Sequence, residues 1–232
     1  MRVVLNKARL ARRAQVANLA SVGGMVALLA GVIVPLFLPQ LGQIAPLVVI
    51  LGGIIISMVG IYQANRWVRK PRPEEQLGKA LKGLDDKYVL YHYPAGLPCD
   101  HLLLTPGGVV NLETVNLAGQ FTYQNKRWSE RMTFGRALRS IVEERLGDPT
   151  KSALAVQRNL TEQLTALTGE AVAVKPLIIF THTNVELELE PGGPVPVHTL
   201  SKLKKQVSID GPRLSPAAYE AIAGFFEKAV KG

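Results

Sequence analysis

Apolar residues dominate the first part of the chain, in a run far longer than a core helix needs. No Asp, Glu, Lys or Arg occurs from residue 14 to residue 65, an uncharged stretch of 52 residues. One crossing of a bilayer takes about 20 apolar residues, and the sequence "PQLGQ" at residues 39–43 divides the stretch in two. The pattern therefore predicts two transmembrane helices, at about residues 17–38 and 44–64.

Small residues recur in both expected helices. If they face one another they let the two backbones approach closely, and the ordinary glycine and alanine content of membrane helices is the alternative explanation. They are Gly23, Ala27 and Gly31 in the first helix and Gly53 and Ser57 in the second. A cleaved signal peptide is a weaker alternative for the first helix, because its apolar stretch is too long and a second one follows.

The chain beyond the apolar run begins with helix and strand patterns. Prolines and acids ahead of Leu77 and Leu81 predict a short helix that contains Glu74 in its first turn. Pro106 and Gly107 predict a type II turn between two strands. The expected strands are "KYVLYHY" (87–93), "DHLLL" (100–104), "VVNLETV" (109–115) and "GQFTY" (119–123).

The second half of this region continues the alternation. "DPTKSALAVQRNLTEQLTALTG" (148–169) predicts an amphipathic helix, and "MTFGRALRSIVEERLG" (132–147) fits either a helix or a loop. A buried strand, a half-buried strand and two closing helices follow, at residues 175–182, 185–190, 200–207 and 215–231. We expect two parts, a membrane hairpin with basic flanks at residues 1–72 and one domain of ordinary size at residues 73–232.

Charge separates these two parts. Nine Lys and Arg flank the uncharged run on both sides and account for the whole formal net charge of +9, whereas from residue 73 onward 18 basic residues balance 18 acidic ones. The connection between the expected helices has no cation, so the positive-inside rule predicts that both termini and the domain lie in the cytoplasm, on a multi-pass protein of the cell membrane. The lipid bilayer is the expected partner, with anionic lipid head groups at the basic flanks. Nucleic acid is a partner that the balanced charge of the domain disfavours.

The most specific motif is an acid and a histidine before an apolar strand, a Pro/Gly turn, and a strand that ends in Glu. It is written "CDHLLLTPGGVVNLETVNLAGQ" (99–120), with Glu74 before it, and Trp128, "GDP" and "PLIIFTH" after it. In this order the residues resemble the nuclease-related domain, abbreviated NERD, over about residues 73–207. The resemblance implies an α/β domain with the αβββαβ order and mixed sheet of the restriction-endonuclease-like PD-(D/E)xK superfamily.

The resemblance also implies a set of site residues. Asp100 and Glu113 match the metal-binding acids, which would bind Mg²⁺ weakly, and Glu74 matches the acid of the first helix. Val115 stands where the family's Glu-x-Lys motif has its lysine. Since alternate residues of a strand share a face, a lysine there would reach the same phosphate or water as the metal. Losing such a group typically costs on the order of 10² to 10⁴ in rate, unless Lys126 or Lys151 enters the site from another element.

Ordinary structural roles are the alternative explanation for these residues. Without the resemblance, Asp100 and Glu113 are typical of solvent-facing strand ends. A regular strand points His101 to the face opposite Asp100, which favours a packed histidine. The single cysteine, Cys99, forms no disulfide framework, and with His92, His182 and His198 it shows no metal-ligand spacing.

Three functions follow from these patterns. The favoured one is a membrane-anchored, catalytically degenerate NERD-like module that binds a divalent metal, nucleic acid or a protein at the membrane. The alternative is an active, Mg²⁺-dependent, membrane-tethered nuclease, and the third is a structural membrane protein. The sequence leaves substrate and oligomeric state open.

Overall fold

A computed structural model describes residues 1–38, 42, 44–132, 145–209 and 212–231. Contacts divide the chain into two compact units, which are described separately. The main unit contains Met1–Asn6 together with Pro73–Arg131 and the chain from Leu146 onward, and the other contains Lys7–Arg72. The first six residues, which the sequence pattern assigned to the hairpin, thus lie in the main unit.

The second unit is a hairpin of two long helices, α1 (Lys7–Phe37) and α2 (Ile44–Trp67). Both are long and apolar enough to cross a membrane by length and composition. The helix α1 begins ten residues before the expected position, since the first turns contain the basic residues that the uncharged window left out and Lys and Arg are good helix formers.

The two helices contact each other through residues spaced seven apart. In α1 the buried residues are Leu10, Ala17, Gly24 and Gly31, and in α2 they are Gly53, Gly60 and Trp67. A Cβ atom at Gly24 would lie 2.6 Å from the backbone N of Ser57, and one at Gly53 would lie 2.9 Å from the backbone N of Leu28. The expected close approach is therefore present, but Gly23 is not part of it, because a Cβ there would meet nothing within 4 Å.

The main unit is built on a six-stranded mixed sheet with the strand order β1-β2-β3-β4-β7-β9. Pairing is antiparallel between β2 and β3 and between β3 and β4, and parallel for the other neighbours. The strands are β1 (Arg2–Leu5), β2 (Val89–His92), β3 (His101–Thr105), β4 (Gly108–Val115), β7 (Val174–Phe180) and β9 (Val197–Thr199). The edge strand β1 has no counterpart in the sequence-based prediction.

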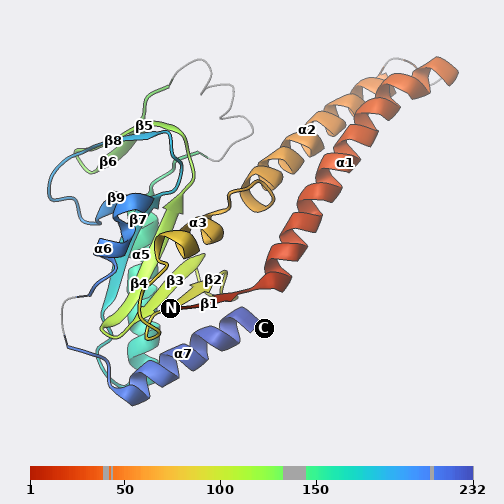
Figure 1. The fold of residues 1–232 in the computed structure, drawn as a ribbon. Helices are drawn as coiled ribbons and strands as arrows, with labels where there is room; N and C mark the ends of the chain where they lie inside the picture. Colours follow the sequence, from red (N-terminus) through yellow and green to blue (C-terminus); the bar gives the residue numbers. More distant parts are fainter. Residues whose placement is uncertain (39–41, 43, 133–144, 210–211, 232) are drawn as a thin grey trace. The chain divides into compact units, whose positions relative to one another are not determined.

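Helices cover both faces of this sheet (Figure 1). On one face α5 (Pro149–Thr168) and α7 (Pro216–Lys231) pack on side chains that include Tyr91, Leu102 and Val109. On the other face α3 (Pro73–Ala80) and α6 (Leu200–Gln206) pack on a second set that includes Leu103, Val110 and Leu112. The order α3–β2–β3–β4–α5–β7 is the expected αβββαβ core, so the predicted fold class is confirmed.

Two predicted strands belong to a separate three-stranded sheet. It has the order β6-β5-β8, from β5 (Gly119–Gln124), β6 (Arg127–Glu130) and β8 (Val185–Leu189). A third apolar cluster joins this sheet to the end of β4 and β7 through Phe121 and Phe180, whose ring centroids are 5.2 Å apart.

The turn between β3 and β4 differs from the prediction. A type II turn needs a positive φ at its second central residue, which is Gly107, but the positive φ (142°) occurs one residue later, at Gly108. A side chain at Gly108 is excluded in addition, because its Cβ would overlap the carbonyl group of Ala173. The segment that fitted either helix or loop lies outside the described residues at positions 133–144.

Candidate metal site

Asp100 directly precedes β3 and continues its pairing. Its carbonyl oxygen accepts a hydrogen bond from the backbone N of Tyr93 at 2.6 Å. The β3–β4 ladder ends where Leu102 lies opposite Asn111, and the same register continued by two residues would set Asp100 opposite Glu113. Opposed residues point to the same face, with Cβ atoms about 4.5–5.5 Å apart. Both acids therefore lie at the same end of β3 and β4, two residues beyond the last pair of the ladder.

Glu113 faces α5 and is half-buried. The Oγ of Ser152, in the first turn of α5, donates a hydrogen bond of 3.0 Å to Oε1 of Glu113. The start of α5 is fixed by Asp148, whose Oδ1 accepts from the backbone N of Lys151 at 2.9 Å. Glu113 thus contacts a side chain of the first turn of α5, where the helix N-terminus carries partial positive charge.

Glu74 lies in a different environment, on α3. It is 5% exposed, and its Oε2 accepts a hydrogen bond of 2.8 Å from the hydroxyl of Tyr93. Tyr93 has a left-handed backbone (φ 58°) directly after β2, a conformation that is rare for a bulky residue and that persists where surrounding contacts determine it. The structure therefore joins Glu74 to Tyr93 in the α3 layer, whereas Glu113 contacts α5.

Two histidines complete this buried polar cluster. His92 lies opposite His101 in the β2–β3 ladder, and their Nδ1 atoms are 2.8 Å apart, so one ring donates to the other. Both residues are 1% exposed. Burial, and next the charge of His101, hold the pKa of His92 well below its ordinary value of 6.5. The packed, hydrogen-bonded role expected for His101 is confirmed.

Val115 follows Glu113 on the same face but packs in apolar surroundings. It is 8% exposed and belongs to the third apolar cluster, with Phe121, Ile178 and Phe180. Of the two lysines named as substitutes, Lys126 has a left-handed backbone (φ 61°) in the β5–β6 turn. Lys151 is exposed and is adjacent in sequence to Ser152, the residue that contacts Glu113.

Sequence reasoning missed three residues at this end of the sheet: Asn111, Ser152 and Tyr93. Asn111 carried a usable signal, because it interrupts the apolar run "GVVNL" of a buried strand. Ser152 and Tyr93 have ordinary sequence surroundings, and only tertiary contacts reveal them. In the described part of the chain, no group of three or more His, Cys, Asp or Glu is arranged to hold a metal ion.

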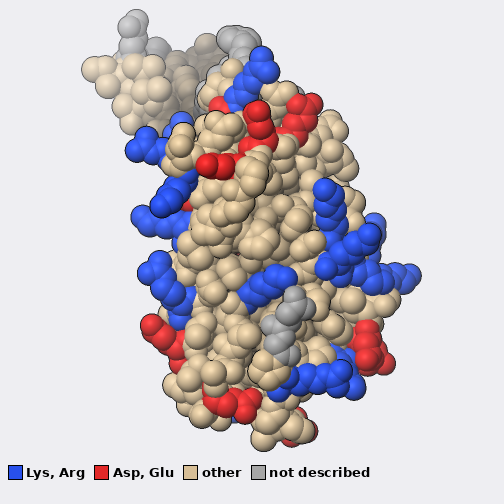
Figure 2. Space-filling view, turned by 90° about the vertical axis from the view of Figure 1, so that its left-hand side faces the viewer, with Lys and Arg blue, Asp and Glu red and all other residues tan. Residues whose placement is uncertain are grey.

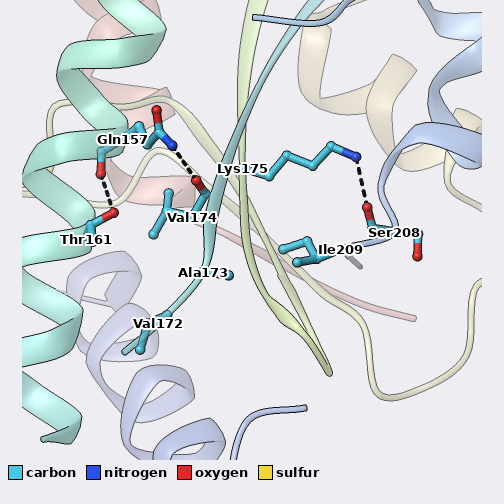
Figure 3. A pocket seen from close by; sticks show the side chains of 8 residues that line it. All are labelled: Gln157, Thr161, Val172, Ala173, Val174, Lys175, Ser208 and Ile209. Atoms are coloured by element: carbon cyan, nitrogen blue, oxygen red, sulfur yellow. Dashed lines mark hydrogen bonds between the residues drawn. The ribbon is translucent and has the colours of Figure 1, made fainter. Parts of the chain in front are cut away.

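A separate open hollow of about 490 Å³ lies beside the start of β7. Its polar groups are engaged with one another, as Figure 3 shows: Gln157 donates to the carbonyl of Val174 at 2.9 Å, and Lys175 donates to that of Ser208 at 2.9 Å. In the β4–β7 ladder Val174 pairs with Val109, whereas Glu113 pairs with Ile178. The hollow therefore lies at the opposite end of the strands from the two acids.

The order of helices and strands in the main unit is the αβββαβ order expected for a nuclease-related domain. Residues 71–181 match the family model of the nuclease-related domain, NERD, so the chain carries a NERD domain, preceded by two long apolar helices. Neither the curated proteins nor the solved structures compared with this chain include a match.

Proposed function

We propose that this chain is a membrane-anchored, catalytically degenerate NERD module that binds a divalent cation and holds a partner at the membrane. The observation that carries the loss of catalysis is the packing of Val115. The position of the motif lysine is filled by a valine within a cluster that contains Phe121 and Phe180, and a valine side chain can neither orient a nucleophile nor stabilise the charge on a phosphate.

The donor set supports binding of Mg²⁺ or Mn²⁺. Asp100 and Glu113 supply carboxylate oxygens, which hard divalent cations prefer as ligands. Asp100 is half-buried like Glu113, so both carboxylates can meet an ion that keeps several of its waters. When bound, the ion would supply positive charge for a phosphate or carboxylate group of the partner.

The surface of the hairpin supports insertion in a bilayer. Its two helices bury glycine and alanine between them and expose large apolar side chains, among them Leu19 (73% exposed), Leu36 (77%) and Ile44 (78%). A contiguous apolar surface of this kind is unfavourable in water, and packing through small residues is typical of helices in lipid. The basic flanks then meet anionic lipid head groups.

The pairing of strand β1 supports the location of both ends of the hairpin on the same side of the membrane. It precedes α1, and it pairs with β2, which follows α2. The two ends of the hairpin therefore meet in a single sheet, which requires an even number of crossings. Together with the nine flanking cations, this favours a cytoplasmic main unit.

The charge distribution disfavours tight, nonspecific binding of nucleic acid. Figure 2 shows basic and acidic side chains interspersed over one face, with a broad uncharged area between them. Nonspecific affinity for nucleic acid depends on many Lys and Arg contacts to phosphate. The balanced main unit is better suited to a protein partner or to a short nucleic-acid segment bound through the ion.

The test is a cleavage assay on the full chain in detergent, with DNA and RNA substrates and Mg²⁺ or Mn²⁺. We expect no cleavage above that of an Asp100→Ala control. Metal-dependent cleavage that Asp100→Ala abolishes would overturn the proposal and establish the alternative, an active membrane-tethered nuclease. Lys151 and then Lys126 would be the first lysines to replace.

A further inference from the structure

Asn111 is a buried amide that the fold does not satisfy. It lies in the middle of β4 and is 0% exposed, and among the described residues neither its Oδ1 nor its Nδ2 has a hydrogen-bond partner. Its neighbours in the ladders are Leu102 on β3 and Pro176 on β7, whose side chains offer no hydrogen bond. Buried polar groups are nearly always satisfied, so such an amide indicates a water or ligand beside it.

The position of Asn111 directs it to the candidate metal site. Residues two apart in a strand share a face and lie about 6.6 Å apart, so Asn111 and Val115 are the two neighbours of Glu113 on this face of β4, and Asn111 is the polar one. On its other side along this face, Val109 belongs to an apolar cluster. Glu113, at the end of the strands where Asp100 also lies, is thus the polar neighbour on β4 toward which the amide can be satisfied.

A neutral polar group suits the third position beside the two carboxylates of the candidate metal site. Two carboxylates alone leave most of the coordination sphere of Mg²⁺ or Mn²⁺ to water. An amide offers an acceptor oxygen and two N–H donors without a charge, and a third carboxylate at a fully buried position would add repulsion and a desolvation cost.

We propose that Asn111 is a positioning residue of the divalent site, whose amide holds a water ligand of an ion bound by Asp100 and Glu113. This inference rests on the proposed metal-binding function. It also accounts for both unusual residues that flank Glu113 on this face. The lysine position on one side is apolar Val115, and the polar group lies on the other side, deeper in the sheet. With Asn111 holding a water ligand of the ion and no lysine at position 115, the site is suited to binding the ion and not to cleaving a phosphate ester.

The experiment measures Mn²⁺ binding to the full chain in detergent by the loss of the free-ion electron paramagnetic resonance signal. The wild-type chain should bind one ion, and Asp100→Ala should abolish binding. Asn111→Val should weaken the affinity about 10-fold, since groups that orient metal ligands typically contribute 10- to 100-fold. At the same time Asn111→Val should keep or raise the melting temperature of the ion-free protein, because it removes an unsatisfied amide.

Two further variants separate a ligand-facing role from a packing role. Asn111→Asp keeps an oxygen at the site and should retain or tighten Mn²⁺ binding, with a larger rise in melting temperature on adding Mn²⁺ than the wild type shows. Thr114→Val removes a polar group next to Glu113 on the opposite face of β4 and should leave the affinity unchanged. If Asn111→Val fails to fold, Asn111→Ser, whose shorter side chain cannot hold the same water, should show the loss of affinity.

The outcomes are distinct. A wild-type chain that binds no Mn²⁺ refutes the metal-binding function and the role of Asn111 with it. Binding that Asp100→Ala abolishes but that Asn111→Val and Asn111→Ser leave at the wild-type affinity refutes the role of Asn111 alone. Loss of affinity in Thr114→Val equal to that in Asn111→Val would also overturn it, since the effect would then follow from any change in β4.

Discussion

The buried His92, near the candidate metal site, makes the stability of the protein depend on pH. His92 is held neutral by burial, with a folded-state pKa well below the ordinary 6.5, so the unfolded chain binds its proton more readily. The stabilising contribution is complete above pH 6.5 and is lost as the pH falls below 6.5 toward the folded-state pKa. We expect the free energy of unfolding to drop by up to about 1.4 kcal/mol per pH unit in that range.

The check for His92 is chemical unfolding of the full chain in detergent at several values between pH 7.5 and 5.5. His92→Gln should flatten the dependence, because glutamine does not titrate. An equally steep loss of stability in the variant would show that other groups cause it.

Val115 yields a second prediction at this scale. A lysine at this position would place a charged group in the cluster of Phe121 and Phe180, so Val115→Lys should destabilise the protein by about 1–3 kcal/mol. Val115→Met, similar in length but uncharged, controls for overpacking and should cost less. Denaturant unfolding of both variants is the measurement. A Val115→Lys chain as stable as the wild type would mean that the side chain reaches solvent or Glu113, as an active nuclease would need.

At the scale of elements, the packing of α1 on α2 depends on which glycine faces the partner helix. Gly24 and Gly23 are adjacent, but a Cβ meets Ser57 at the first and open space at the second. Gly24→Leu should therefore separate the helices and lower the stability of the hairpin by about 1–3 kcal/mol, the usual cost of overpacking. Gly23→Leu should be neutral. Thermal unfolding in detergent, followed by helical circular dichroism, distinguishes them, and equal effects would contradict the heptad interface.

The same elements show how far the sequence could predict the fold. Periodicity and end signals placed α5 between Asp148 and Gly169, because a proline, a side-chain cap and a C-terminal glycine are local features. The sequence did not reveal β1, since four residues before a helix carry no pattern of their own and become a strand only by pairing with β2. It also could not separate β5 and β8 into a second sheet, because strand patterns do not encode partners.

The candidate site was predictable to the same extent. Asp100 and Glu113 could be named because their motif is continuous in sequence, and alternation along the strands gave their common face. The contact of Ser152 with Glu113 and the contact of Tyr93 with Glu74 join residues 39 and 19 positions apart. Such contacts depend on the docking of α5 and α3 against the sheet, which no local pattern contains.

For the whole molecule, β1 changes how the chain is organised. The hairpin is inserted between β1 and α3 of the main unit, because Met1–Asn6 and the chain from Pro73 onward form one compact unit. Arg2 also forms an ion pair with Glu227 of α7 at 2.5 Å. A fragment that begins at residue 73 would lack an edge strand, so experiments on this protein are best made with the full chain.

This organisation leads to a prediction of topology. Since both ends of the hairpin enter the same sheet, Leu38, which directly follows α1, should lie on the opposite side of the membrane from α7. In a Cys99→Ala background, an impermeant thiol reagent added to intact cells should label Leu38→Cys and leave Lys228→Cys unlabelled. Lysed cells should show labelling at both positions, which controls for accessibility. Labelling of both variants in intact cells, or of Lys228→Cys alone, would contradict a cytoplasmic main unit with two crossings.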